Sequence, residues 1–237
     1  MCSGKTWGFT LHPSFKPVID LIRAILGRSR EDREAELIAK LTQSQKRSIL
    51  LLGDSLVAAS QAHGGHPDVI MAAVGRSRVA DVLAIVSRTK SNGVWDSVGG
   101  LVVGVGINDA EWREGDDLQS RTLYFRSMLD ALVRACLDRP VAILTITEPE
   151  KEGAQVDRFS RDLIERQNAE IRAVGDRAIV FDMDTKFRAS LAKAGLPVSA
   201  GFTDGVHISE AGYQHWRPLL VECIDAVRAI SRQTEGA

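Results

Sequence analysis

Short apolar runs alternate with longer amphipathic stretches over most of the chain. The apolar runs are typical of strands buried on both faces, and they predict five strands, at residues 48–52, 68–74, 99–105, 140–146 and 177–183. The amphipathic stretches predict helices at residues 78–88, 118–137, 156–174, 186–195 and 209–230. This alternation predicts an α/β fold with a parallel sheet between two helical layers. Because crossovers are right-handed, we expect a flavodoxin-like, doubly wound three-layer sandwich.

The first part of the chain lacks this alternation. Residues 1–16 predict an irregular arm, residues 18–26 have helical spacing, and residues 30–43 continue that helix or form another. We therefore expect an N-terminal arm and helix over residues 1–45, packed on or beside a main domain over residues 46–237.

Composition narrows the class of protein. The 237 residues are 44% hydrophobic and 26% charged, as in a globular domain. The formal net charge of −1 gives no field that would attract nucleic acid or an anionic membrane. No apolar run is long enough for a membrane span or a signal peptide, so we expect a cytoplasmic enzyme. The three cysteines are widely separated, which predicts neither a disulfide framework nor a zinc site, and Cys136 and Cys223 are expected in the core.

Polar residues collect where the predicted strands end. The first strand ends at Gly53-Asp54-Ser55, the second at Gly75, and the third at Gly106-Ile107-Asn108-Asp109, while the loop before the last helix holds Asp204-Gly205-Val206-His207. Ligands bind outside the carboxyl ends of the strands in open α/β sheets. We therefore expect these residues to meet at one edge of the sheet.

These residue types fit acyl transfer to a serine. A serine hydroxyl needs a base to remove its proton, and His207 can serve as that base. Asp204, three residues earlier, can hold the imidazole in the required tautomer. Attack on an ester creates an oxyanion, to which the side chain of Asn108 and the backbone N–H of Gly75 and of Ser55 can donate hydrogen bonds.

The four blocks Gly53-Asp54-Ser55-Leu56, Gly75, Gly106-Ile107-Asn108-Asp109 and Asp204-Gly205-Val206-His207 resemble, in order, those of the SGNH/GDSL hydrolases. The resemblance covers about residues 48–230. It implies a flavodoxin-like fold, Ser55 as nucleophile, His207 as base with Asp204 as its partner, and Gly75 and Asn108 as oxyanion donors. Residues 1–45 match no family block.

Other residues have simpler interpretations. Asp54 and Asp109 are expected to be structural, the first as a helix cap. The group His63, His66 and Asp68 has spacing compatible with a metal, but a polar loop is the preferred interpretation, and no metal or other cofactor is predicted. Tyr213 and Trp216, three residues apart on a helix, favour core packing, whereas Trp112 and Phe202, on predicted loops, are candidates for a substrate pocket.

The sequence predicts a serine esterase or acylhydrolase acting on a small-molecule ester, such as an acylated sugar or lipid. The site is expected to be open, to favour short acyl groups, and to be bordered by residues 108–117 and 147–156, whose acidic excess argues against polyanionic substrates. Two alternatives are an acyltransferase on the same scaffold and a receiver-like phosphate-accepting domain using Asp54, Asp109 and Lys186.

Overall fold

The computed structural model describes residues 30–44, 47–62 and 66–235. It contains a five-stranded parallel sheet in the order β2-β1-β3-β4-β5, made of β1 (Ser48–Gly53), β2 (Val69–Met71), β3 (Val98–Gly104), β4 (Val141–Leu144) and β5 (Ile179–Phe181). This order is that of flavodoxin-like sheets, so the predicted fold class is confirmed. The arm and helix predicted before residue 30 lie outside the described residues.

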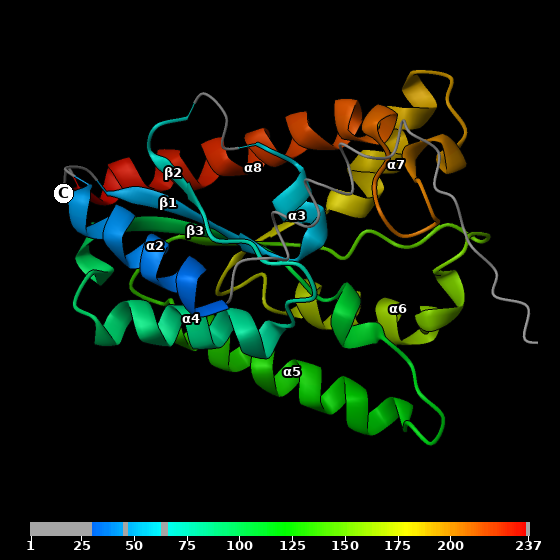
Figure 1. Ribbon diagram of the computed structural model, residues 1–237, viewed down its shortest axis with the longest axis horizontal. Coiled ribbons are helices and arrows are strands. Elements are labelled where there is room, and N and C mark those ends of the chain that lie inside the picture. Colours follow the sequence, from blue (N-terminus) through cyan, green and yellow to red (C-terminus); the bar gives the residue numbers. More distant parts are fainter. Residues whose placement is uncertain (1–29, 45–46, 63–65, 236–237) are drawn as a thin grey trace, which may run out of the picture.

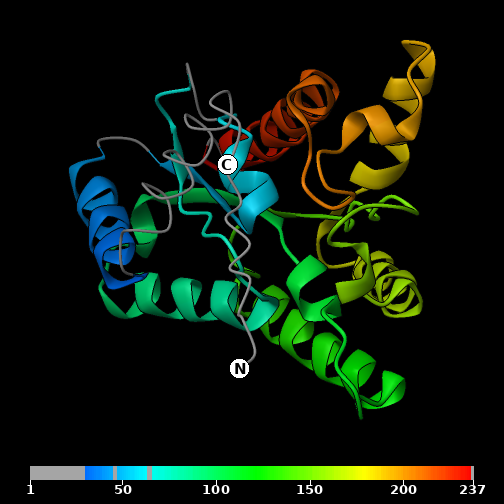
Figure 2. The same ribbon diagram turned by 45° about the vertical axis from the view of Figure 1, so that its right-hand side comes forward.

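Helices cover both faces of the sheet (Figure 1). One face carries α2 (Arg30–Gln43), α4 (Val79–Ser91), α5 (Leu118–Ala135) and α6 (Arg161–Ala173). The other carries α3 (Ser55–Ala59), α7 (Met183–Lys193) and α8 (Glu210–Glu235). The view of Figure 2 shows α4 and α8 on opposite sides of the strands. The described residues also contain the 3₁₀ turns η2 (Trp95–Ser97), η3 (Ile107–Ala110), η4 (Val156–Arg158) and η5 (Val198–Gly201).

The strands explain why two cores form. Successive side chains of a strand point to opposite faces. In β1, Leu50 and Leu52 pack with the layer of α4 and α5, whereas Ile49 and Leu51 pack with that of α7 and α8. All four side chains are almost completely buried, as expected for a strand covered on both faces.

Several boundaries differ from those predicted. The predicted helix over residues 156–174 is divided into η4 and α6, because the Ser160 side chain accepts a hydrogen bond from the Leu163 N–H (3.3 Å) and caps a new helix. The last helix begins at Glu210, one residue after its predicted start, and continues through Pro218 to Glu235, five residues beyond its predicted end at residue 230. Strands β2 and β5 are each shorter than their apolar runs, since only three residues of each pair with a neighbour.

Helix α8 packs along the sheet and contributes much of one core. Its Tyr213 and Trp216 are 9% and 2% exposed and pack edge to face at 6.0 Å, so their predicted core role is confirmed. Cys136 and Cys223 are buried free thiols, also as predicted, and burial raises the pKa of each to about 12. Among the described residues, no helix combines the length and apolar character needed to cross a membrane.

Candidate active site

Ser55 is the first residue of α3, directly beyond the carboxyl end of β1. Two glycines allow this short helix to lie close to the strand ends. These are Gly53 at the end of β1 and Gly104 at the end of β3. A Cβ on Gly53 would lie 2.5 Å from the Gly104 carbonyl oxygen, and a Cβ on Gly53 or on Gly104 would lie 2.6 Å from a methyl carbon of Val57 in α3. The side chain of Ser55 is only half-buried, so the packing of α3 holds its hydroxyl at the surface of the sheet edge.

The neighbours of Ser55 are fixed from two sides. The Asp54 carboxylate accepts a hydrogen bond from the Leu56 N–H (3.0 Å) and caps α3, as predicted. From α8, the Tyr213 hydroxyl donates to the Leu56 carbonyl (2.8 Å), and the Arg217 Nε donates to the Ser60 carbonyl (2.5 Å). These contacts position the Ser55 backbone without using its hydroxyl.

The turn after β2 lies beside the end of β1. The Val74 N–H donates to the Gly53 carbonyl (2.9 Å), so Gly75 follows one residue beyond this contact. The Asn108 side-chain amide donates to the Ser77 carbonyl (3.1 Å), which joins η3 to the same turn. Within the described residues, the N–H groups of Ser55 and Gly75 donate no hydrogen bond to the protein. Unsatisfied donors of this kind are what an oxyanion site requires.

Two buried carboxyls lie under this edge. Asp54 is 2% and Asp109 5% exposed, and Asp109 accepts a hydrogen bond from the Val79 N–H (3.1 Å) at the start of α4. Burial is the main reason that the pKa of each is raised to about 7, and the charge of Asp109 further raises the pKa of Asp54. Both residues have the structural contacts expected of them.

Asp204 and His207 form a pair within one loop. The His207 Nδ1 lies 2.8 Å from the Asp204 Oδ2, while the Asp204 Oδ1 accepts hydrogen bonds from the N–H of His207 (2.8 Å) and of Val206 (3.0 Å). Gly205, with φ of +88°, makes this tight turn possible. Burial alone raises the pKa of Asp204, but the hydrogen bonds from His207 and Val206 outweigh it and lower that pKa. The imidazole itself is 52% exposed.

The structure thus pairs Asp204 with His207. Separately, it connects Asn108 to the turn that contains Gly75. In the described part of the chain, the Ser55 hydroxyl makes no hydrogen bond to His207 or to any other side chain. Catalytic hydrogen bonds are often long or absent before substrate binds. The roles of these five residues stay predictions.

Two acids of the loop after β3 are paired with arginines. The carboxylate of Glu111 lies 2.7 Å from Arg158, 3.3 Å from Arg78 and 4.0 Å from Arg113. The hydrogen bond from Arg158 is the main cause of the lowered pKa of Glu111. Asp116 is paired with Arg121 at 2.5 Å. Glu114 and Asp117 are exposed and make no ion pair with a described residue, so the inference from sequence that this loop disfavours polyanionic substrates rests on these two acids and stays a prediction.

The two pocket candidates differ in their surroundings. Trp112 is 36% exposed on the loop that follows η3, where a substrate can reach it. Phe202 is 8% exposed and packs edge to face on Phe187 at 5.9 Å. Its ring belongs to the core beneath α7 and α8, and we do not include it in the proposed pocket.

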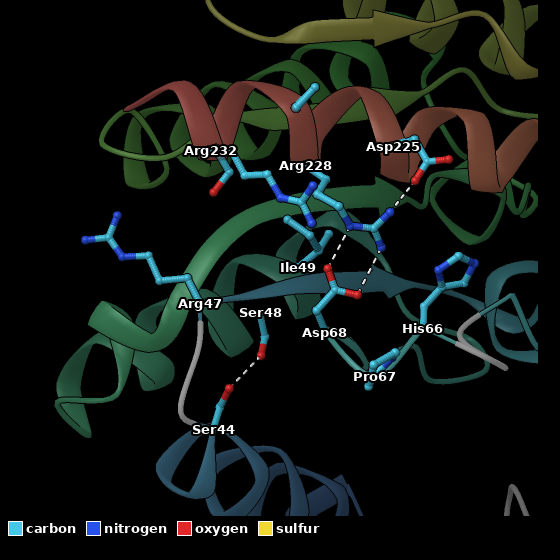
Figure 3. A pocket seen from close by; sticks show the side chains of 12 residues that line it. Ser44, Arg47, Ser48, Ile49, His66, Pro67, Asp68, Asp225, Arg228 and Arg232 are labelled. Atoms are coloured by element: carbon cyan, nitrogen blue, oxygen red, sulfur yellow. Dashed lines mark hydrogen bonds and ion pairs between the residues drawn. The ribbon is translucent and has the colours of Figure 1, made fainter. Parts of the chain in front are cut away.

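A cavity of about 1190 Å³ opens at the opposite end of the sheet, where β1 and β2 begin (Figure 3). Its charged residues are largely bound to one another: Arg228 contacts Asp68 at 2.7 Å and also pairs with Asp225. It contains none of the predicted site residues. Over the described ranges, no three histidine, cysteine or acidic side chains form a group that could hold a metal ion, and His63 lies outside those ranges.

Sequence reasoning missed the contacts that join distant segments. The contact of Asn108 with Ser77 and those of Glu111 with Arg78 and Arg158 had no signal in the sequence, because the partners are 31 to 47 positions apart. The Asp204–His207 pair was visible because its members are three residues apart.

Comparison with known proteins agrees with this fold. The profile of the GDSL-like lipase/acylhydrolase family matches residues 51–215, and the chain belongs to this family of hydrolases. A comparison with curated protein sequences finds no match.

Solved structures with the same fold include three bacterial proteins. A lipase/acylhydrolase from Enterococcus faecalis is 19% identical, with a TM-score of 0.56 over 79% of this chain and 96% of that one. A GDSL-like lipase from Bacteroides thetaiotaomicron is 14% identical, with a TM-score of 0.59 over 84% and 99%. The acetylxylan esterase Axe2 from Geobacillus stearothermophilus is 18% identical, with a TM-score of 0.52 over 74% and 93%. At these identities the likeness concerns the fold.

Proposed function

We propose that this protein is a serine esterase that cleaves carboxylic esters with short acyl groups through an acyl-enzyme. The observation that carries the proposal is the contact of 2.8 Å between the Asp204 Oδ2 and the His207 Nδ1. An aspartate on Nδ1 leaves Nε2 as the nitrogen that can accept a proton. Membership of the GDSL-like lipase/acylhydrolase family supports the same chemistry.

In the proposed mechanism, the Ser55 Oγ attacks the acyl carbon while the His207 Nε2 takes the hydroxyl proton. The negative charge that forms on the carbonyl oxygen is met by the N–H groups of Ser55 and Gly75 and by the Asn108 amide. The carbon–oxygen bond to the alcohol breaks, and the imidazolium gives the alcohol its proton. A water, deprotonated by His207, then attacks the acyl-enzyme, releases the acid and restores the serine.

A fluorophosphonate probe tests the assignment of the nucleophile. We expect one adduct, on the peptide that contains Ser55, because the activated hydroxyl displaces fluoride from phosphorus. Peptide mass spectrometry locates the adduct, and heat-denatured protein, in which the site no longer exists, should not react. Labelling of another serine, or none in an active preparation, would contradict the proposal. Labelling by acetyl phosphate with magnesium would favour the receiver-like alternative. That alternative needs Lys186 at the phosphate, but in the structure Lys186 is paired with Glu222 at 3.0 Å.

A series of 4-nitrophenyl esters tests the preference for short acyl groups. Ser55 is half-buried, His207 is exposed, and the cavity beside Asp54 and Leu56 measures only about 20 Å³. A buried acyl channel would add up to about 0.8 kcal/mol of binding for each methylene. Without one, we expect kcat/KM to stay level or fall from acetate to octanoate. A tenfold rise along the series would show a lipid-binding channel, and product analysis with an added alcohol would detect acyl transfer.

A further inference from the structure

We propose that Arg76 determines substrate specificity by binding an anionic group, a carboxylate or a phosphate, on the ester that the enzyme cleaves. The inference rests on the proposed function, because it places the substrate at the edge formed by Ser55, Gly75 and Asn108. Arg76 lies between Gly75 and Ser77, and Ser77 is the residue whose carbonyl receives the Asn108 amide. Its position in the chain therefore places Arg76 within the proposed oxyanion site.

The side chain of Arg76 is exposed, and it forms no ion pair or hydrogen bond with another described residue. This distinguishes it from the other arginines of the same edge. Arg78, Arg113 and Arg158 contact Glu111, and Arg121 contacts Asp116. A guanidinium without a partner among the described residues is available to a ligand, and its planar arrangement of N–H donors suits a carboxylate or phosphate.

The backbone of Arg76 is also unusual. Its φ of +65° lies in the left-handed region, which is unfavourable for a non-glycine residue. Strained residues of this kind cluster at functional sites. Glycine would adopt this conformation without the cost, and a glycine is the preceding residue. The residue at this strained position is instead an arginine, which suggests that the positive charge of Arg76 has a binding role.

The surrounding charges are of both signs. Three guanidinium groups converge on the single carboxylate of Glu111, so the charge immediately around this residue is positive. Asp109, the nearest acid to Asn108 in sequence, is buried, and burial raises its pKa to about 7. Glu114 and Asp117, in the exposed part of the loop, make no ion pair with another described residue. The cluster around Glu111 thus attracts an anionic substrate, whereas the exposed acids at the end of the loop repel it.

The test compares charged and neutral esters of the same shape. One pair is 4-acetoxybenzoate and its methyl ester, which places the anion on the alcohol side. The other is the 4-nitrophenyl monoester of succinic acid and 4-nitrophenyl butyrate, which places it on the acyl side. For each pair, the ratio of kcat/KM for the anionic ester to that for the neutral ester is measured in wild type and variants. Comparing ratios between proteins cancels the intrinsic reactivity of the esters.

We expect Arg76→Gln to lower this ratio about 5- to 10-fold for at least one pair, as for the loss of one partly exposed charge-assisted contact. Arg76→Gly, which suits the positive φ and also removes the charge, should lower it equally, and Arg76→Lys should lower it less. The control Arg134→Gln removes an exposed arginine near the far end of α5 and should leave the ratio at its wild-type value.

Ionic strength gives a second measurement. In wild type, the ratio should fall as sodium chloride rises from about 20 mM to about 500 mM, because salt screens an exposed charge pair. In Arg76→Gln it should change little. An unchanged ratio in both Arg76→Gln and Arg76→Gly would overturn the role of Arg76 while leaving the esterase proposal intact. Absence of activity on every ester in wild type would overturn the esterase proposal and this inference with it.

Discussion

Replacing Ser55 by alanine should reduce kcat/KM for 4-nitrophenyl acetate by at least about 10³-fold, because the acyl-enzyme can no longer form. The fold should remain intact. The Ser55 hydroxyl makes no hydrogen bond to another described side chain, and its side chain is half-buried at the start of α3. Alanine is well tolerated in a helix. Initial rates and a thermal unfolding curve, recorded on the same preparation, measure the two effects.

Ser60 provides the matched control. It follows the last residue of α3, is completely buried, and donates its hydroxyl to the Val57 carbonyl at 2.6 Å. Its Oγ also accepts a hydrogen bond from the Ala62 N–H at 3.3 Å. Ser60→Ala leaves these buried partners unpaired and should therefore destabilise the protein by about 1–3 kcal/mol, while the folded enzyme still turns over ester. The two serines thus separate loss of chemistry from loss of structure. If Ser55→Ala kept more than a tenth of the wild-type activity, Ser55 would not be the nucleophile.

The features that the sequence predicted are those determined by local pattern. The five apolar runs and the handedness of crossovers favoured a flavodoxin-like sheet, and the observed strand order β2-β1-β3-β4-β5 is of that kind. The cap formed by Asp54 and the pair of Asp204 and His207 involve residues two or three positions apart. A short spacing restricts what the two side chains can contact, so such interactions can be read directly from the residue types.

The features that it missed depend on segments that only folding brings together. The loop after Gly106 contains several acids and was interpreted as an acidic rim. Its Glu111 is surrounded by Arg78 and Arg158, 33 and 47 positions away, which no local pattern indicates. Phe202 was assigned to a loop and hence to a pocket, but its ring packs on Phe187 from α7. Charge and exposure at the site are thus properties of the tertiary structure.

The two buried carboxyls beneath the site should make the protein less stable as pH rises. Burial raises the pKa of Asp54 and of Asp109 from the usual value of 3.8 to about 7. Between about pH 4 and pH 7, the unfolded chain releases protons that the folded protein retains. Rising pH therefore favours the unfolded state over this range, and the free energy of unfolding should decline until both groups ionise in the folded protein.

The size of the effect follows from the same linkage. One pKa unit corresponds to about 1.4 kcal/mol, so a shift from 3.8 to about 7 gives each carboxyl an effect of at most about 4 kcal/mol. Urea unfolding at intervals from about pH 5 to about pH 8 measures the decline. Wild-type stability that stays constant or increases over this range would contradict the prediction.

Asparagine variants assign the decline to these groups. In Asp54→Asn and Asp109→Asn, the amide oxygen can still accept the hydrogen bonds from Leu56 and Val79, but nothing at that position ionises. Each variant should therefore lose less stability than wild type between about pH 5 and about pH 8.

Asp138→Asn serves as the control. Asp138 is 49% exposed, and hydrogen bonds from Trp95 and Lys90 lower its pKa despite partial burial, so this carboxyl is already ionised over the whole range in both folded and unfolded protein. Its removal should shift stability by the same amount at every pH, and a flattened curve in this variant would show that the decline does not arise from Asp54 and Asp109.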